Sequence, residues 1–133
     1  MRIGSLSNAL QYSTSGLAAE RFRMDTISSN IANVNTVAKP GEDGYRRRSV
    51  VLRATDSGVQ IESVREDFDR ECIKKHDPTS QFANADGDVV YSNVDPTMEM
   101  VDMISASRAY EANIAAFNTV KGMMNSALQI GKI

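Results

Sequence analysis

The chain has 133 residues, of which 24% are charged, and a formal net charge of −2. This length suits one ordinary domain, and the slight acidic excess argues against a nucleic-acid surface, which needs a concentrated excess of lysine and arginine. The single cysteine excludes an intramolecular disulfide framework, and we find neither an apolar run long enough to span a bilayer nor a cleavable signal peptide.

The N-terminal segment, residues 1–35, carries an apolar seam at seven-residue spacing. The seam consists of Leu10, Leu17, Met24 and Ile31, with Ile27 on the neighbouring row. This spacing places the side chains on one narrow stripe of a helix. We predict that the helix starts between Ser5 and Gly16, where the small residues 13–16 form either a cap or a close-packing face. It ends near the asparagines of residues 30–36, because asparagine competes for backbone hydrogen bonds.

The central segment, residues 36–93, holds most of the charged residues and the strong turn signals. Two strands are predicted over Tyr45–Leu52 and Val59–Val64, joined by a turn at residues 55–58, which makes a β-hairpin. A second pair is predicted over Phe68–Lys75 and Val89–Ser92. We interpret the short basic run Arg46–Arg48 as the solvated side of the first strand.

Residues that could carry chemistry are sparse in this segment. His76 is the only histidine, and Cys72 has no obvious base to activate it. Asn84, Asp86 and Asp88 mimic the first ligands of a calcium-binding loop, but the glycine of that pattern stands one residue before Asp88 instead of after it. We therefore read this stretch as a turn and predict no catalytic residues, no cofactor and no metal site.

The C-terminal segment, residues 94–133, opens with a clear helix signal. Asp95 supplies a capping carboxylate, and Pro96 stands in the first helical turn, where its missing N–H costs nothing. The predicted helix runs to about Gly131. Its apolar seam consists of Met103, Tyr110, Phe117 and Met124, flanked by Ile114 and Val120.

Together the two seams predict a mainly α fold with a small β insert, in which the long N- and C-terminal helices pair as a coiled coil. Neither terminal segment has the charged outer face of a helix that is exposed on one side, so we expect these helices to pack on several sides. This layout indicates a polymer subunit before an enzyme. Alternatives are a simple intramolecular helical hairpin and a soluble coiled-coil adaptor that closes into a small oligomer. A membrane-surface protein is disfavoured by the few basic residues beside the seams.

Two stretches resemble a known family. Residues 29–36 read SNIANVNT and resemble the N-terminal signature of the bacterial flagellar rod and hook protein family. Residues 99–118 read EMVDMISASRAYEANIAAFN and resemble the C-terminal helix of the same family. The resemblance runs nearly from end to end, apart from Glu66–His76.

This resemblance implies a structural subunit of the flagellar basal body that is exported without a cleaved signal peptide and built into the periplasmic drive shaft. It implies partners among copies of this chain, other rod proteins, and the rod-base and export-gate proteins, with no nucleic acid and no direct lipid binding. Residues 1–35 and 94–133 would form the assembly core, and residues 36–93 would project outward. The candidate subunit-interface residues are Leu10, Leu17, Met24, Ile27, Ser29, Asn30, Ile31, Asn33, Thr36, Met103, Tyr110, Ile114, Phe117, Val120 and Met124.

Such long helices gain little from folding alone. We therefore expect the two ends to be loose in a single subunit and to become ordered on assembly.

Overall fold

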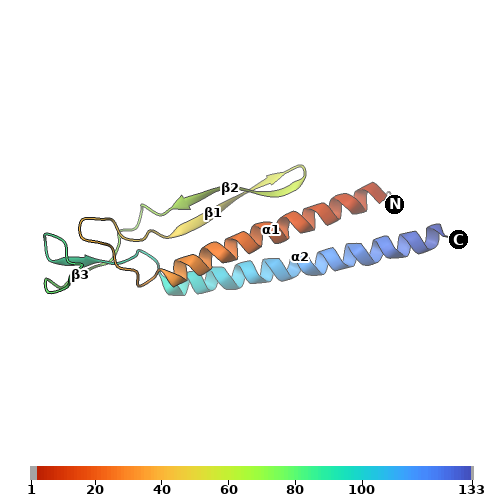
Figure 1. Cartoon of the computed structure of the whole chain (residues 1–133). Helices are drawn as coiled ribbons and strands as arrows, with labels where there is room; N and C mark the ends of the chain where they lie inside the picture. Colours follow the sequence, from red (N-terminus) through yellow and green to blue (C-terminus); the bar gives the residue numbers. More distant parts are fainter. Residues whose placement is uncertain (1–2, 133) are drawn as a thin grey trace.

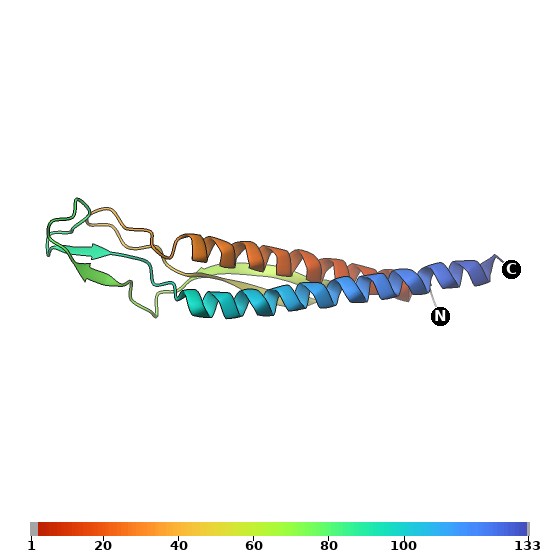
Figure 2. The same cartoon turned by 90° about the horizontal axis from the view of Figure 1, so that it is seen from below.

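Two long helices lie side by side along the length of the molecule (Figures 1 and 2). The computed structural model describes residues 3–132. Helix α1 spans Ile3–Ala32 and helix α2 spans Pro96–Gly131, so their lengths are about 45 and 54 Å at 1.5 Å per residue. The helices are antiparallel, and both ends of the chain lie at the same pole (Figure 1). The predicted mainly α fold with a small β insert is confirmed.

Helix α2 begins as the sequence predicts. Asp95 is its N-cap, and its carboxylate accepts a hydrogen bond from the backbone N–H of Thr97 at 3.0 Å. Pro96 occupies the first turn, where no intrahelical bond is lost by lacking an N–H.

Helix α1 ends at the predicted polar cluster but starts earlier than predicted. Its last turn is closed by Asn33, whose side chain donates to the carbonyl of Ser29 at 2.8 Å. The predicted start between Ser5 and Gly16 is wrong, because the helix already includes Ile3. Of the small residues 13–16, Gly16 packs closely on α2, since a Cβ there would lie only 2.8 Å from the side chain of Asn113, whereas Thr14 is exposed. A small residue is needed where the two helices approach each other.

The predicted β-hairpin is present and folds back along α1. Strands β1 (Arg48–Thr55) and β2 (Gly58–Glu66) pair antiparallel around a two-residue turn, with Gly58 at a φ of 126°. The hairpin lies on the side of α1 away from α2 (Figure 1). Two hydrogen bonds fasten its tip to α1: Tyr12 donates to the carbonyl of Asp56 at 2.9 Å, and the N–H of Val59 donates to the Ser15 hydroxyl at 3.0 Å. The order across the molecule is hairpin, α1, α2.

The second strand pair is shorter than predicted. Strands β3 (Lys74–His76) and β4 (Asp88–Val90) have three residues each, so the predicted strand over Phe68–Lys75 is mostly wrong. The Asp67 carboxylate accepts the N–H groups of Asp69 and Arg70 at 2.9 and 3.2 Å, and such a side-chain turn competes with strand pairing.

The stretch before β4 is a turn, as predicted. The Asn84 side-chain oxygen accepts the N–H groups of Asp86 and Asp88 at 3.0 and 2.9 Å, and Gly87 has a φ of 81°. Of the calcium-like side chains, Asn84 thus holds the backbone, and Asp88 bonds to His76 at 2.9 Å.

Candidate functional site: a polar junction and two exposed faces

A buried ionic cluster lies at the closed end of the helical pair, where α1, the start of β1 and the first turn of α2 meet. The Glu99 side chain is fully buried. Its two oxygens accept hydrogen bonds from the Arg47 guanidinium and, at 3.0 Å, from the Asn30 amide. Another guanidinium nitrogen of Arg47, Nη2, lies 2.9 Å from the carboxylate of Asp102, one turn further along α2. A buried carboxylate is tolerated because a cation and an amide share it.

Asn30 links α1 to the first strand. Its amide nitrogen also donates to the carbonyl of Arg48 at 2.7 Å, while its oxygen accepts from the N–H of Arg48 and the hydroxyl of Tyr45, both at 3.0 Å. An amide side chain carries its donor and its acceptor on separate atoms, so it can bond to both the N–H and the carbonyl of one residue. Within the single chain, the Asn30 side chain therefore bonds to the first residue of β1 as the backbone of a neighbouring strand would.

Residues just before α2 complete the polar junction. The N–H of Arg47 donates to the Asn93 side chain at 2.6 Å, and the Asn93 amide donates to the carbonyls of Asp67 and Arg70 at 2.9 and 3.1 Å. The Ser92 hydroxyl donates to the carbonyl of Val34 at 2.7 Å. Among the described residues, no buried side-chain nitrogen or oxygen lacks a partner. We call Asn30, Arg47, Asn93, Glu99 and Asp102 the polar junction.

The interpretation of Arg46–Arg48 as a solvated strand face is wrong for its first two members. Arg46 and Arg47 precede β1, and their side chains are only 17% and 20% exposed. Burial lowers the pKa of Arg47, but the hydrogen bond and the charge of Glu99 outweigh it, so the pKa lies above its usual value. A signal that could have revealed this pairing is Glu99 followed by Asp102, two acids on one face of a helix that has few charges.

The sequence-predicted interface residues fall into three groups by exposure. Ile27 and Asn30 are buried in the single chain, whereas Ile114 and Thr36 are exposed. The others are half-buried: Leu10, Leu17, Met24, Ser29, Ile31, Asn33, Met103, Tyr110, Phe117, Val120 and Met124. Pairing of α1 with α2 thus covers the seams in part and leaves area on most of these side chains.

Among the apolar surfaces left uncovered in the described residues, two stand out that sequence reasoning did not single out. The first, which we call the α2 ridge, consists of Met100, Val101 and Ile104, each more than half exposed. The second is a groove of about 450 Å³ between α1 and β2, which we call the α1–β2 groove. Its lining residues are Phe22, Asp25, Thr26, Ser29, Arg48, Val64 and Glu66. Exposed apolar patches of this kind mark interaction sites in soluble proteins.

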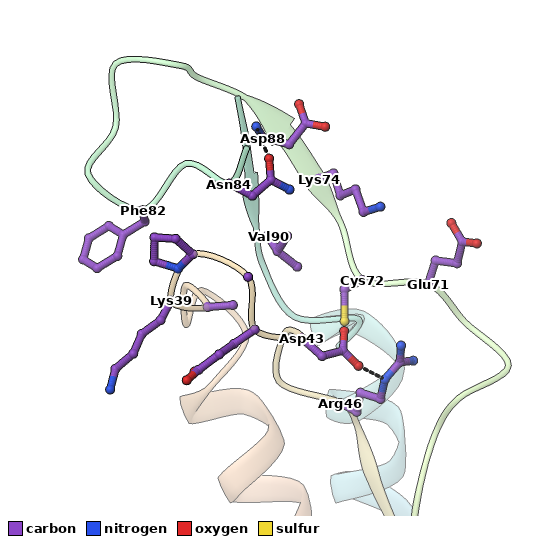
Figure 3. Close-up of a pocket in the computed structure, with 14 residues that line it drawn as sticks. Lys39, Asp43, Arg46, Glu71, Cys72, Lys74, Phe82, Asn84, Asp88 and Val90 are labelled. Atoms are coloured by element: carbon purple, nitrogen blue, oxygen red, sulfur yellow. Dashed lines mark hydrogen bonds and ion pairs between the residues drawn. The ribbon is translucent and has the colours of Figure 1, made fainter. Parts of the chain in front are cut away.

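A polar pocket of about 380 Å³ lies at the tip of the molecule beyond the closed end of the helical pair, between the loop after α1 and the β3–β4 pair (Figures 1 and 3). Asp43 holds Arg46 at 2.7 Å beside it, which lowers the pKa of the Asp43 carboxyl. Burial, and then the charge of Asp43, raises the pKa of the Cys72 thiol. A raised pKa is the opposite of what an activated cysteine nucleophile needs.

Within residues 3–132, no three His, Cys, Asp or Glu side chains gather closely enough to hold a metal ion. Over the same residues, neither helix has a stretch with the length and apolar character required to cross a bilayer.

Comparison with known proteins matches both ends of the chain to flagellar families. Residues 10–38 match the flagella basal body rod protein family, and residues 87–130 match the C-terminal family of the flagellar basal body rod proteins FlgEFG. The flagellar basal-body rod protein FlgC of Bacillus subtilis is 40% identical, over 94% of this chain and 97% of its own. The FlgC proteins of Salmonella typhimurium and Aquifex aeolicus are 37% and 35% identical, over 96% and 94% of this chain and 99% and 96% of their own. On this similarity along nearly its whole length, the chain belongs to the flagellar basal-body rod protein FlgC family.

Proposed function

We propose that this chain, by family a structural subunit of the flagellar basal-body rod, polymerises through the outer faces of its paired terminal helices. The observation that carries the proposal is the α2 ridge, where Val101 is 61% exposed on a helix that packs against no other helix or strand than α1 within the described residues. Covering such a face with another molecule is favourable by roughly 25 cal/mol for each Å² of apolar surface removed from water.

In this proposal the half-buried and exposed members of the predicted interface set contact neighbouring subunits. Ile27 and Asn30 act indirectly, because they hold α1, β1 and α2 in register inside the chain. Residues 1–35 and 94–133 form the assembly core, and the tip that carries β3 and β4 projects from it. Loose free ends that order on contact with neighbours would suit passage through a narrow export channel.

We place the assembled subunit in the periplasmic part of the basal body, reached without a cleaved signal peptide. The proposed partners are further copies of this chain, other rod proteins, and proteins of the rod base and export gate. The role is mechanical and involves no catalysis. Family membership supports this placement. The alternative of a soluble adaptor that closes into a small oligomer is not favoured by relatives that are rod proteins.

A pair of matched variants tests the proposal in a strain that lacks its own gene for this subunit. Val101→Asp puts a charge on the α2 ridge, whereas Ile73→Asp makes a comparable change at a residue that is equally exposed, 61%, in the central segment. We expect Val101→Asp to abolish incorporation into purified basal bodies, measured by immunoblot, together with swimming. Ile73→Asp should retain both to a large extent.

Variants in the seams extend the test to the predicted interface residues. Met24→Asp and Phe117→Asp are expected to prevent incorporation while the β1–β2 hairpin stays folded, which circular dichroism of the purified chains can check. Normal rods built from Val101→Asp and Phe117→Asp subunits would contradict the proposal.

A further inference from the structure

The α1–β2 groove combines apolar walls with one unpaired acid. Phe22 and Val64 line it and are both exposed. Of its two carboxylates, Glu66 already pairs with Arg48 at 3.7 Å. The side chain of Asp25 makes no ion pair and no hydrogen bond within residues 3–132. The groove therefore offers apolar area and a free negative charge.

The α2 ridge offers the complementary features. Val101 and Ile104 face away from α1, because the buried residues of α2, Glu99 and Ala106, lie on the opposite side of the helix. Arg108 follows Ile104 by one turn and is exposed. In the described part of the chain, its guanidinium has no acidic partner.

Groove and ridge lie at the same height along the helices. Asn30 of α1 bonds to Glu99 of α2, and Gly16 packs against Asn113. Because the helices are antiparallel, Asp25 is then level with Ile104, and Arg108 lies about 6 Å further along the axis, within the reach of an arginine side chain. The hairpin and α2 form opposite outer layers of the molecule (Figure 1), so copies placed side by side present ridge to groove without a large axial shift.

We infer that the α2 ridge of one copy fills the α1–β2 groove of the next copy, with Arg108 pairing with Asp25 across the contact. The inference rests on the proposed role as a rod subunit and names the surfaces that such subunits use. Two different surfaces on one molecule make a heterologous contact, which repeats from copy to copy and generates a row or helix instead of a closed pair. Opposite charges at its edge fix the orientation of the contact.

Charge reversal with compensation tests this pairing. The variants are expressed in a strain that lacks the gene for this subunit. Asp25→Lys and Arg108→Glu should each lower incorporation into basal bodies by about tenfold, because each variant places two like charges opposite one another at the contact. The chain with both substitutions should recover most of the loss, since every copy then presents Lys opposite Glu. Arg53→Glu, an exposed reversal on β1 far from the ridge, serves as the control for net charge.

A cross-link gives an independent readout. With Cys72→Ser as background, Val64→Cys and Ile104→Cys in one chain should give dimers and longer ladders from assembled rods with a bismaleimide, and neither cysteine alone should. A double reversal that assembles no better than the single ones, or rods that give no ladder, overturns the pairing while the role as a rod subunit stands. Failure of the wild-type chain itself to enter basal bodies would overturn the proposed function.

Discussion

The two ends of the helical pair are stabilised in different ways. At the closed end, the polar junction satisfies a fully buried carboxylate with two residues, one from α1 and one from the stretch before β1. At the open end, α2 carries Leu128 and Ile130 at 54% and 73% exposure, and among the described residues no ion pair joins α1 to α2 there. The buried interior of the closed end is satisfied within one molecule, whereas the open end has further apolar area that a neighbour can cover. We expect stability to reside at the closed end, and assembly to use this apolar area together with the α2 ridge.

The largest effect on stability is expected from Glu99→Ala. The substitution leaves the half-buried Arg47 without its main partner and the Asn30 amide without an acceptor. Breaking a buried ion pair from one side costs about 3–5 kcal/mol of unfolding free energy, which urea denaturation followed by circular dichroism can measure. The control is Asp102→Ala, since its carboxylate is 35% exposed and should contribute at most about 1 kcal/mol. Equal losses in both variants would show that burial of Glu99 does not matter.

A smaller effect is expected from Asn30→Ala, which removes the link between α1 and the first strand. Glu99 keeps Arg47 in this variant, so we expect a loss of about 1–3 kcal/mol for the polar groups left unpaired. Asn35→Ala in the same motif is the matched control, because Asn35 is exposed. Unfolding free energies that are equal for the two variants would exclude a structural role for Asn30.

The smallest effect on stability is expected at the open end. Leu128→Ser should change the unfolding free energy by no more than about 0.5 kcal/mol, as for most surface substitutions. The same variant should still reduce incorporation into basal bodies, because it removes apolar area from the end that we expect neighbours to cover. A large fall in the stability of the isolated chain would place Leu128 in the folded core and erase the contrast between the ends.

The sequence predicted features that depend on neighbouring residues. The Asp95–Pro96 pair located the start of α2, and the seven-residue seams predicted two long helices. The turn before Val59 predicted the first hairpin, since turn chemistry is local. The side of a helix that is apolar can be read from its period alone.

Features that depend on distant residues could not be predicted in this way. Arg47 and Glu99 are 52 positions apart, and nothing local distinguishes the half-buried Arg47 from its exposed neighbour Arg48. The role of Asn30 was equally hidden, because its partners are the backbone of a strand and a carboxylate from another helix. The α1–β2 groove arises only when the hairpin folds onto α1. Such surfaces follow from tertiary packing, which one sequence does not encode in any periodic pattern.

Both ends of the chain emerge at one pole, and the β3–β4 tip forms the other (Figure 1). A fluorescent reporter fused to either terminus would therefore sit beside the open ends of both helices and obstruct them together. An epitope inserted between Thr79 and Ala83, in the loop that joins β3 to β4, would stand a full molecular length away. That loop is the place to label this subunit in a working motor.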